Sequence, residues 1–584
     1  MQMPKPLQSS RILHFRPPIP RLQRFSAGDA FILLSLVALL YAGAQLAVRA
    51  PDVVTGPQIS LSIGALPWYA LLSTGRMAAA YVLSLLFSLV YGYVAVRNRT
   101  AGRIMMPILD VLQSIPILSF LPVVLLSLTA LLPEHLGAEL AAILLIFTSQ
   151  AWNMTFSFYQ SMTTVPTELR EAASIFRLDP WQRFKTLELP FAALGLIWNS
   201  MMSWAGGWFF LMAAEIFQVG TRDFRLAGLG AYLQVASDQG NVGAVLAGLV
   251  TLILVIIALD QLIWRSLLVW ADKFKLEMVS GDEPPESWFF DLVSRSQMLK
   301  AVRTHVIDPV SEALDSVLHR ELNVQPEPTE SAPGSERPTV WAWAIGIVLG
   351  LTVVYAGYQA LALLATLSLA DWGHLALSVL ATFLRVSVAL AIAMLWTVPV
   401  GVLIGTNRRA AAVLQPVVQV VASIPATALF PVFLLVLLRL PAGLNLAAVL
   451  LMLMGTQWYV LFNVIAGAAA IPQDLIFTTD LMRLSTWERW KTLILPALFP
   501  YLVTGGITAS GGAWNASIVA EYVKFSGSAH ATLGVGALIA EATSSGNYAL
   551  LLAGTLALMG TVVFVNRTFW RSLYRLAETR FRME

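Results

Sequence analysis

Cysteine is absent from this 584-residue sequence, and charged residues are scarce. Without cysteine the chain forms no disulfide, gives a metal no thiolate ligand and has no cysteine nucleophile. Only 12% of the residues are charged, about half the share of an ordinary soluble domain. The six histidines are scattered without metal-ligand spacing. These absences exclude disulfide-rich, zinc-binding and thiol-dependent proteins, and we expect no metal site.

The phosphate-binding pattern G-x-x-x-x-G-K-[ST] is also missing. In that pattern the glycine-rich backbone and the lysine hold the phosphates of a nucleotide. The glycine pairs Gly206-Gly207 and Gly511-Gly512 lack the lysine and lie inside apolar runs. We therefore expect that the chain is no enzyme by itself and binds no cofactor. If ATP with Mg²⁺ powers it, the nucleotide is bound by a partner.

Long apolar runs dominate what is present. Hydrophobic residues make up 57% of the chain and the mean hydropathy is +0.71, which is typical of a polytopic membrane protein surrounded by lipid. The net charge of +3 is too small to indicate a nucleic-acid partner. The predicted spans are roughly 29–49, 77–96, 106–132, 138–160, 191–216 and 242–270, then 340–367, 378–404, 412–438, 443–468, 497–519 and 546–570.

Arginine and lysine cluster in alternate loops, including 97–103, 170–185, 408–409 and 483–491. Because cytoplasmic loops are enriched in these residues, both termini are predicted to be cytoplasmic. Six spans in each half then give two halves of the same direction, a parallel repeat. The predicted parts are a basic N-terminus 1–28, a first repeat 29–270, a cytoplasmic linker 271–338, a second repeat 339–570 and a tail 571–584.

A charged loop occurs twice between apolar spans. RLDPWQRFKTLELP at 177–190 returns as RLSTWERWKTLILP at 483–496, with nine of fourteen positions identical and an offset of 483 − 177 = 306. PILDVLQSIPILSFLP at 107–122 matches PVVQVVASIPATALFP at 416–431 at an offset of 309. Constant offsets over such distances indicate an internal duplication.

The repeated loop has the form of a docking element. A short helix, a turn near 178–180 and a second helix ending before Pro190 are expected, with Thr167 as the first cap. Trp181, Phe184 and Leu187 share one apolar face, which can enter a groove on a soluble partner. The alternative is a loop whose aromatic side chains anchor among lipid headgroups. Its repetition with the same spacing favours docking.

Glu171-Ala172-Ala173, followed by Trp181 and Leu189-Pro190, resembles the "EAA" loop of binding-protein-dependent ABC permeases. The Ser-Ile-Pro elements at 114–116 and 423–425 and the Glu215 and Gly228-x-Gly230 region are similar to the nitrate, sulfonate and taurine subfamily. The resemblance implies the type I importer fold, here as two fused all-α permease repeats of about twelve transmembrane helices.

The same resemblance implies partners and a location. The implied partners are two ATPase subunits docked on the loops, a periplasmic or lipid-anchored solute-binding protein, and membrane lipids, and the implied location is the bacterial inner membrane. The predicted docking residues are Glu171, Ala172, Ala173, Arg177, Trp181, Arg183, Lys185, Pro190, Arg483, Trp487, Arg489, Lys491 and Pro496.

The sequence departs from the motif in two places. Arg177 and Arg483 stand where the motif has glycine, so we expect the turn to be made differently. The second copy reads Phe477-Thr478-Thr479 in place of Glu171-Ala172-Ala173. The missing glutamate predicts that the two halves couple unequally to the ATPases.

Polar residues and prolines inside the spans are candidates for a translocation path. Prolines are expected to break the third and ninth spans at equivalent places, and the freed backbone groups need protein or a water-filled cavity. Intramembrane carboxylates are costly and point to function, although pairing at a helix end or helix–helix hydrogen bonding are alternatives. Arg76 and Arg385 either snorkel or steer an anion. The predicted path residues are Gln113, Ser114, Pro116, Asn153, Gln419, Ser423, Pro425, Gln457, Asn463, Glu215 and Glu521.

The leading function is therefore the permease of an ATP-driven importer, and the resemblance implies a small anion of the nitrate, sulfonate, taurine or bicarbonate type. One alternative is a secondary transporter, which shares a six-plus-six parallel repeat but needs intramembrane acid or histidine relays. Another is a membrane scaffold or enzyme, which would need a nucleophile or metal constellation that the sequence does not show.

Overall fold

The computed structural model describes residues 56–113, 116–219, 222–274, 287–295, 340–422, 424–437, 439–471, 473–525 and 528–580, and a few residues between 34 and 42. The predicted segment 1–28, most of the predicted first span and most of the linker lie outside the described residues. The described part of the linker contains one helix, α12 (Trp288–Arg295), which packs against α11 (Arg265–Asp272).

The first half is a series of helices with one small hairpin before α9. Its elements are η1 (Ile63–Ala65), α2 (Leu66–Arg97), α3 (Arg99–Gln113), α4 (Ile117–Leu131), α5 (Glu134–Thr163), α6 (Thr167–Ile175), α7 (Pro180–Arg183), η2 (Phe184–Glu188), α8 (Leu189–Glu215), β1 (Gln218–Val219), β2 (Arg222–Asp223), α9 (Leu229–Asp238), α10 (Val242–Leu259), η3 (Asp260–Trp264) and α11.

The second half repeats this order. Its elements are α15 (Val340–Leu364), α16 (Leu369–Thr406), α17 (Arg408–Ala422), α18 (Ala426–Leu437), α19 (Gly443–Met454), α20 (Gln457–Ala469), α21 (Gln473–Leu481), α22 (Thr486–Arg489), η5 (Trp490–Ile494), α23 (Leu495–Ala520), β3 (Tyr522–Phe525), β4 (Ser528–Ala531), α24 (Val535–Ser545), α25 (Tyr548–Val565), η6 (Asn566–Trp570) and α26 (Arg571–Arg580). The two antiparallel hairpins, β1–β2 and β3–β4, are strand structure that the sequence did not predict.

The chain is an all-α polytopic membrane protein. Within the described ranges, seven helices are long and apolar enough to cross a membrane. They include α2, with the turn before it, and α5, α16 and the continuous helix from Thr486 to Ala520. Helix α8 has 27 residues, which at 1.5 Å per residue also suffices to span the hydrocarbon core.

The third and ninth predicted spans are each two helices. Helix α3 ends at Gln113 and α4 begins at Ile117, while α17 ends at Ala422 and α18 begins at Ala426. The predicted breaks at Pro116 and Pro425 are confirmed. Pro122, by contrast, lies inside α4 without ending it.

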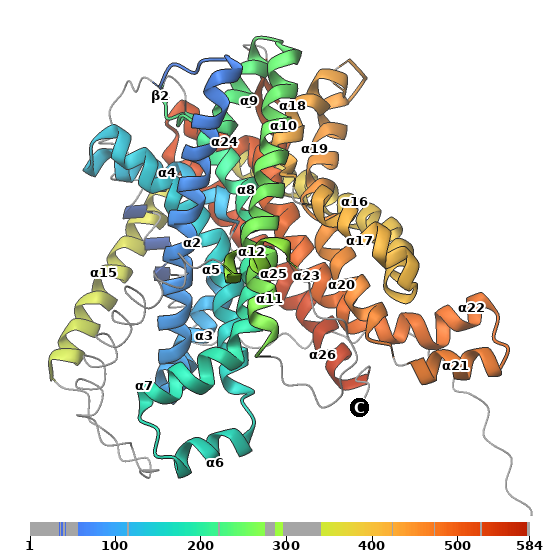
Figure 1. Cartoon of the computed structure of the whole chain (residues 1–584). Helices are drawn as coiled ribbons and strands as arrows, with labels where there is room; N and C mark the ends of the chain where they lie inside the picture. Colours follow the sequence, from blue (N-terminus) through green and yellow to red (C-terminus); the bar gives the residue numbers. More distant parts are fainter. Residues whose placement is uncertain are drawn as a thin grey trace, which may run out of the picture.

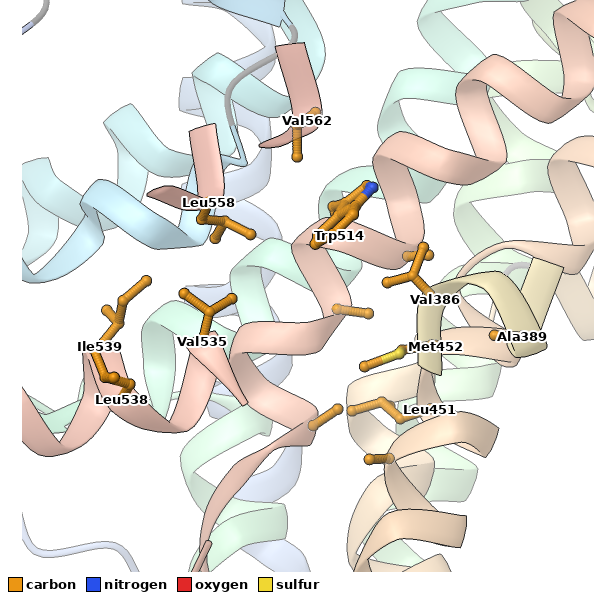
Figure 2. Close-up of a cluster of buried hydrophobic side chains, with 14 of the residues drawn as sticks. Val386, Ala389, Leu451, Met452, Trp514, Val535, Leu538, Ile539, Leu558 and Val562 are labelled. Atoms are coloured by element: carbon orange, nitrogen blue, oxygen red, sulfur yellow. The ribbon is translucent and has the colours of Figure 1, made fainter. Parts of the chain in front are cut away.

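The two halves interleave through the helices that follow these breaks. Helix α4 of the first half packs against α23, α24 and α25 of the second, and α18 of the second packs against α8 and α9 of the first. Val123 of α4 belongs to the large apolar cluster around Trp514, Val386 and Leu558 of the second half, which Figure 2 shows. Burial of apolar side chains between the halves thus holds them together.

The repeated loops lie at one end of this bundle. In Figure 1, α6 and α7 lie at the lower left and α21 and α22 at the lower right, while α9, α24 and β2 lie at the opposite end. The C-terminal helix α26 is at the same end as the loops. The duplication therefore presents two similar surfaces at the same end of the molecule.

Candidate functional site

Each repeated loop is a short helix, a left-handed turn and a second short helix. Helix α6 ends where the Leu178 amide donates to the Ala173 carbonyl (3.0 Å) and the Arg177 amide to the Ser174 carbonyl (3.0 Å). Arg177 has φ 49°, the left-handed conformation that commonly ends a helix. Helix α6 begins after Pro166, whose side chain gives no capping bond, so the predicted cap at Thr167 is wrong.

The second loop makes the same turn. The Leu484 amide donates to the Thr479 carbonyl (3.1 Å), and Arg483 has φ 50°. The prediction that arginine changes the turn is wrong, because both arginines adopt the conformation in which glycine is free of strain. A side chain in this conformation costs roughly 1–2 kcal/mol.

The helix that follows the turn runs into the membrane without ending at Pro190. Asp179 caps α7 by accepting from the Gln182 amide, and Ser485 caps α22 in the same way. The π-helical turn η2 then joins α7 to α8, and η5 joins α22 to α23. The predicted stop before Pro190 is therefore wrong. Proline at the first turn of α8 lacks an amide hydrogen, and a π turn, which is frequent at functional sites, accommodates it.

On the inner side of the first loop, Glu188 is buried and accepts from two arginines. Arg97 and Arg183 each lie 3.0 Å from its carboxylate. In the second loop the equivalent position is Ile494, and Arg489 pairs with Asp480 at 3.0 Å. The prediction places Arg183 and Arg489 in docking, and the structure shows that both are also occupied by carboxylates of their own loop.

On the outer side, each loop exposes an apolar pair at its tip. Ile175 and Phe176 are 78% and 77% exposed, and the equivalent Leu481 and Met482 are 84% and 67% exposed. Such exposed apolar pairs at equivalent places mark an interaction surface.

The motif residues before the tip divide between the two sides of the loop. The first motif position is exposed in both loops, as Glu171 and Phe477, and the third is buried, as Ala173 and Thr479. Trp181 stacks on Phe184, whereas Trp487 is exposed.

A cavity of about 710 Å³ lies between the two halves. Its lining includes Gln113, Pro116, Asn153, Pro425 and Asn463 of the predicted path. Ser114 and Ser423 lie outside the described residues, as does the side chain of Gln419. Gln457, Glu215 and Glu521, which were also predicted as path residues, are not among the residues that line it.

The cavity wall is aromatic and amide-rich. Helix α8 contributes Trp198, Trp204 and Phe209, and η3 and η6 contribute Trp264 and Trp570. Sequence reasoning missed these rings because tryptophan in an apolar span also fits a lipid interface. Among the described lining residues there is no lysine, arginine or histidine, and the one carboxylate is that of Asp260. No described group of three His, Asp or Glu side chains could hold a metal ion.

Glu215 is fully buried at the end opposite the loops and holds three elements together. Its carboxylate accepts from Ser73 Oγ (2.7 Å), Arg76 Nη1 (2.8 Å) and the Gly230 amide (2.7 Å). Arg76 also binds Glu139 through two bonds of 2.6 Å. The carboxylate thus joins α2 to the first turn of α9, and Arg76 neither snorkels nor faces the cavity.

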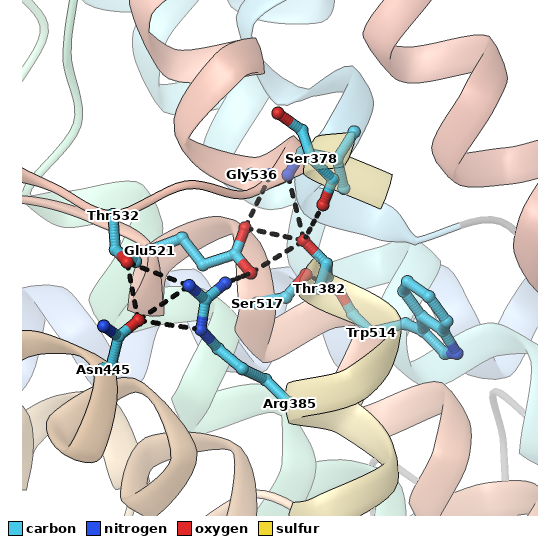
Figure 3. A network of polar contacts seen from close by, with 10 residues as sticks. Ser378, Thr382, Arg385, Asn445, Trp514, Ser517, Glu521, Thr532 and Gly536 are labelled. Atoms are coloured by element: carbon cyan, nitrogen blue, oxygen red, sulfur yellow. Dashed lines mark hydrogen bonds and ion pairs between the residues drawn. The ribbon is translucent and has the colours of Figure 1, made fainter. Parts of the chain in front are cut away.

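Figure 3 shows the equivalent network of the second half. Glu521 accepts from Thr382 Oγ1 (2.7 Å), Arg385 Nη1 (2.8 Å) and the Gly536 amide (2.9 Å). Arg385 binds Asn445 (2.7 Å) where Arg76 has Glu139. The first network therefore carries one carboxylate more than the second.

The glycine before each short helix makes room for the carboxylate. A Cβ at Gly228 would lie 2.2 Å from Glu215 Oε1, and one at Gly534 would lie 2.2 Å from Glu521 Oε2. Both glycines have extended backbones, so they are required for space. The spacing of arginine, glutamate and Gly-x-Gly recurs in both halves, and that recurrence is the signal from which the network could have been predicted.

The chain was compared with known protein families and with individual relatives. The profile of the family described as "Binding-protein-dependent transport system inner membrane component" matches residues 84–263 and again 397–583. These two matches cover more than half of the chain.

Curated relatives match between a quarter and about a third of the chain at low identity. The bicarbonate transport system permease protein CmpB of Synechococcus elongatus is 32% identical over 144 residues, covering 25% of this chain and 50% of the relative. The nitrate import permease protein NrtB of the same species is 28% identical over 172 residues, covering 30% and 58%.

The taurine transport system permease protein TauC of Escherichia coli is 26% identical over 204 residues, covering 35% of this chain and 69% of the relative. The chain spans about half the length of most of the curated relatives it matches. The doubled family match and the repeated fold agree, and the chain belongs to the family of binding-protein-dependent transport system inner membrane components, which it contains twice.

Proposed function

We propose that this chain is the translocating unit of an ATP-driven importer and that a pair of separate ATPase subunits binds its two loops. The observation that carries the proposal is the pair of exposed apolar tips, Ile175-Phe176 and Leu481-Met482, at equivalent positions on one face. A dimeric motor needs two similar sites on the same side. The chain's own lack of a phosphate-binding loop is consistent with a motor on another polypeptide.

The loops are built to pass a displacement to the cavity. Helix α7 continues through η2 into α8, and α22 continues through η5 into α23. Helices α8 and α23 both line the cavity, for example with Trp204 and Ser510. Because these helices have no flexible joint between loop and cavity, a rigid-body movement of either loop moves a wall of the cavity.

We further propose that the loop face is cytoplasmic, that both termini lie on that side and that the membrane is the bacterial inner membrane. The arginines and lysines of the loops support this orientation. A periplasmic or lipid-anchored solute-binding protein would then deliver substrate at the opposite end, near α9 and α24.

The two docking surfaces are proposed to couple unequally. Position 171 presents a carboxylate, whereas the equivalent Phe477 presents an exposed ring. On the inner side, Glu188 links the first loop to Arg97 of α2, whereas the second loop has Ile494 there. The first loop is therefore tied to its neighbouring span by an ion pair at position 188, where the second loop has an apolar side chain at the equivalent position 494.

The substrate proposed first is a small anion, a class that includes organic sulfonates. The support is that the relatives described above are permease proteins for bicarbonate, nitrate and taurine. The alternative of ion-coupled transport has less support, because Glu215 and Glu521 are held by arginines and do not line the cavity.

Co-purification tests the docking. The tagged full-length chain is expressed with a candidate ATPase subunit from a neighbouring reading frame, and the bound ATPase is quantified. Asp at both Ile175 and Phe176 is expected to reduce bound ATPase by about half, and Asp also at Leu481 and Met482 to abolish it. The matched control is Ile63→Asp, because Ile63 is 74% exposed just before the start of α2, at the far end of the molecule from the loops.

Binding that survives all four loop substitutions would refute docking at the loops. Solute uptake by proteoliposomes that contain this chain but no ATPase would instead support the secondary-transport alternative.

A further inference from the structure

The two halves give the cavity chemically different walls. Equivalent positions of α8 and α23 are related by an offset of 306 residues. Trp204 of α8 corresponds to Ser510 of α23, and Phe209 corresponds to Asn515; all four line the cavity. At these two positions the first half is therefore aromatic where the second is polar, whereas Trp208 and Trp264 have aromatic counterparts in Trp514 and Trp570.

The aromatic wall is a packed group of rings. Trp204 lies 5.7 Å from Trp264, with the two ring planes at 62°, and both lie 5.7 Å from Tyr81. These contacts fix the indole rings in place. Trp198, six residues before Trp204 on α8, is 47% exposed and also lines the cavity. Fixed aromatic surface next to a cavity is suited to stacking against another planar ring.

Two polar side chains around the cavity form no hydrogen bond with the described part of the protein. Within the described part of the chain, the amide of Asn153 and the hydroxyl of Ser510 have no hydrogen-bond partner, while Asn463 Nδ2 donates to the Tyr459 carbonyl (2.8 Å). Unused donors and acceptors in an otherwise apolar pocket determine which polar groups of a ligand fit.

The charge of the lining argues against a bare inorganic anion as the bound species. The described lining offers no cation, and it contains the carboxylate of Asp260, whose nearest cation, Arg265, is 3.5 Å away and outside the cavity. A small anion in a low-dielectric site needs a cation or several donors to replace its water. An aromatic ring, by contrast, is stabilised by stacking on the aromatic side chains of the cavity, whatever the charge of the polar group attached to the ring.

We infer that the cavity binds a solute with a planar aromatic ring, held on the ring by Trp198, Trp204 and Phe209 and on its polar edge by Asn153 and Ser510. This inference deepens the proposed function and rests on it for the direction of transport. Within the anion class, it favours an aryl sulfonate over nitrate or bicarbonate. The volume of about 710 Å³ is in the range of sites for small organic ligands.

Four probes separate the ring from the charge. Benzenesulfonate has a ring and a charge, benzenesulfonamide has the ring alone, methanesulfonate has the charge alone, and nitrate is a bare inorganic anion. Binding of each to the purified full-length chain is measured by isothermal titration calorimetry. The two ring compounds are expected to bind at least tenfold more tightly than the other two.

Each test substitution introduces the residue that occupies the equivalent position in the second half. Trp198→Thr places there the residue found at Thr504, and Trp204→Ser the residue found at Ser510. Each is expected to weaken binding of both ring compounds roughly three- to tenfold, the range of a lost aromatic pair. The matched control is Trp68→Ser, because Trp68 is exposed at the start of α2 and does not line the cavity.

Equal or tighter binding of nitrate or methanesulfonate, or undiminished binding of both ring compounds by both tryptophan variants, would overturn the inference. These outcomes are independent of ATPase docking. Loss of docking with ring-dependent binding intact refutes the proposed function alone, whereas docking without ring-dependent binding refutes the cavity assignment alone.

Discussion

Replacing Gly228 by alanine is expected to break the buried network of the first half. The new Cβ would lie between 2.2 and 2.4 Å from three atoms of the Glu215 carboxyl group, so the carboxylate must leave its position. It would lose its bonds to Ser73, Arg76 and the Gly230 amide.

The expected loss of unfolding free energy is about 3 to 5 kcal/mol, the range for breaking a buried ion pair. The lower end is favoured because Arg76 keeps its two bonds to Glu139. Glu215→Ala removes the same contacts without the clash. Alanine at Gly228 should therefore add little once Glu215 is gone, so the coupling in the double-mutant cycle should be close to the whole cost of Gly228→Ala, about 3 kcal/mol.

The assay is the free energy of unfolding of the purified chain in lipid bicelles, measured by steric trapping. Gly75→Ala is the control: Gly75 lies in α2 beside Arg76, and a Cβ there would meet nothing within 4 Å. It should raise stability by up to about 1 kcal/mol, because alanine is the better helix former. A loss below about 1 kcal/mol for Gly228→Ala, or additivity with Glu215→Ala, would refute the role given to this glycine.

Three further predictions concern the loops and the cavity. Arg177→Gly should keep or slightly raise the melting temperature of the purified chain, whereas Arg177→Val should lower it. The reason is that valine is strained at φ 49° and glycine is not. Equal melting temperatures for the two variants would contradict this. Glu188→Gln should lower the free energy of unfolding by about 1–3 kcal/mol, because it leaves Arg97 and Arg183 without a charged partner. Ile494→Val, at the equivalent position, should lower the free energy of unfolding by about 1 kcal/mol. Steric trapping measures both values. Asp260→Asn introduces the residue found at the equivalent position, Asn566. It removes a negative charge, so it should tighten benzenesulfonate binding roughly tenfold at an effective dielectric of about 20 and leave binding of the uncharged benzenesulfonamide unchanged. Calorimetry measures both, and an equal effect on the two compounds would show that the charge of Asp260 does not influence the site.

The repeat made much of the fold predictable from sequence. The offset between 177–190 and 483–496 identified both loops, and the structure gives them the same hydrogen bonds. Pro116 and Pro425 correctly predicted the breaks, because proline lacks the amide that a continuing helix needs. Pro122 did not end α4, although it is the sixth residue of that helix; a helix can continue through a proline, which costs it one backbone hydrogen bond.

Two parts of the site could not be predicted from local sequence alone, for physical reasons. Glu215 and Arg76 are separated by 139 residues, and nothing local to either one shows that α2 and the start of α9 meet. The cavity depends on how the two halves interleave, because its walls come from α8 and α23. A tryptophan in α8 could equally face lipid, and only the packing of α4 and α18 across the halves decides which side chains face the centre.

The difference between the two walls gives the covalent connection of the halves a purpose beyond tethering. Two first halves assembled together would surround the cavity with Trp204 and Phe209 on both sides, and two second halves would surround it with Ser510 and Asn515. One polypeptide that carries a single copy of each half fixes the stoichiometry at one to one. Every molecule that folds therefore has the aromatic pair on one side of the cavity and the polar pair on the other.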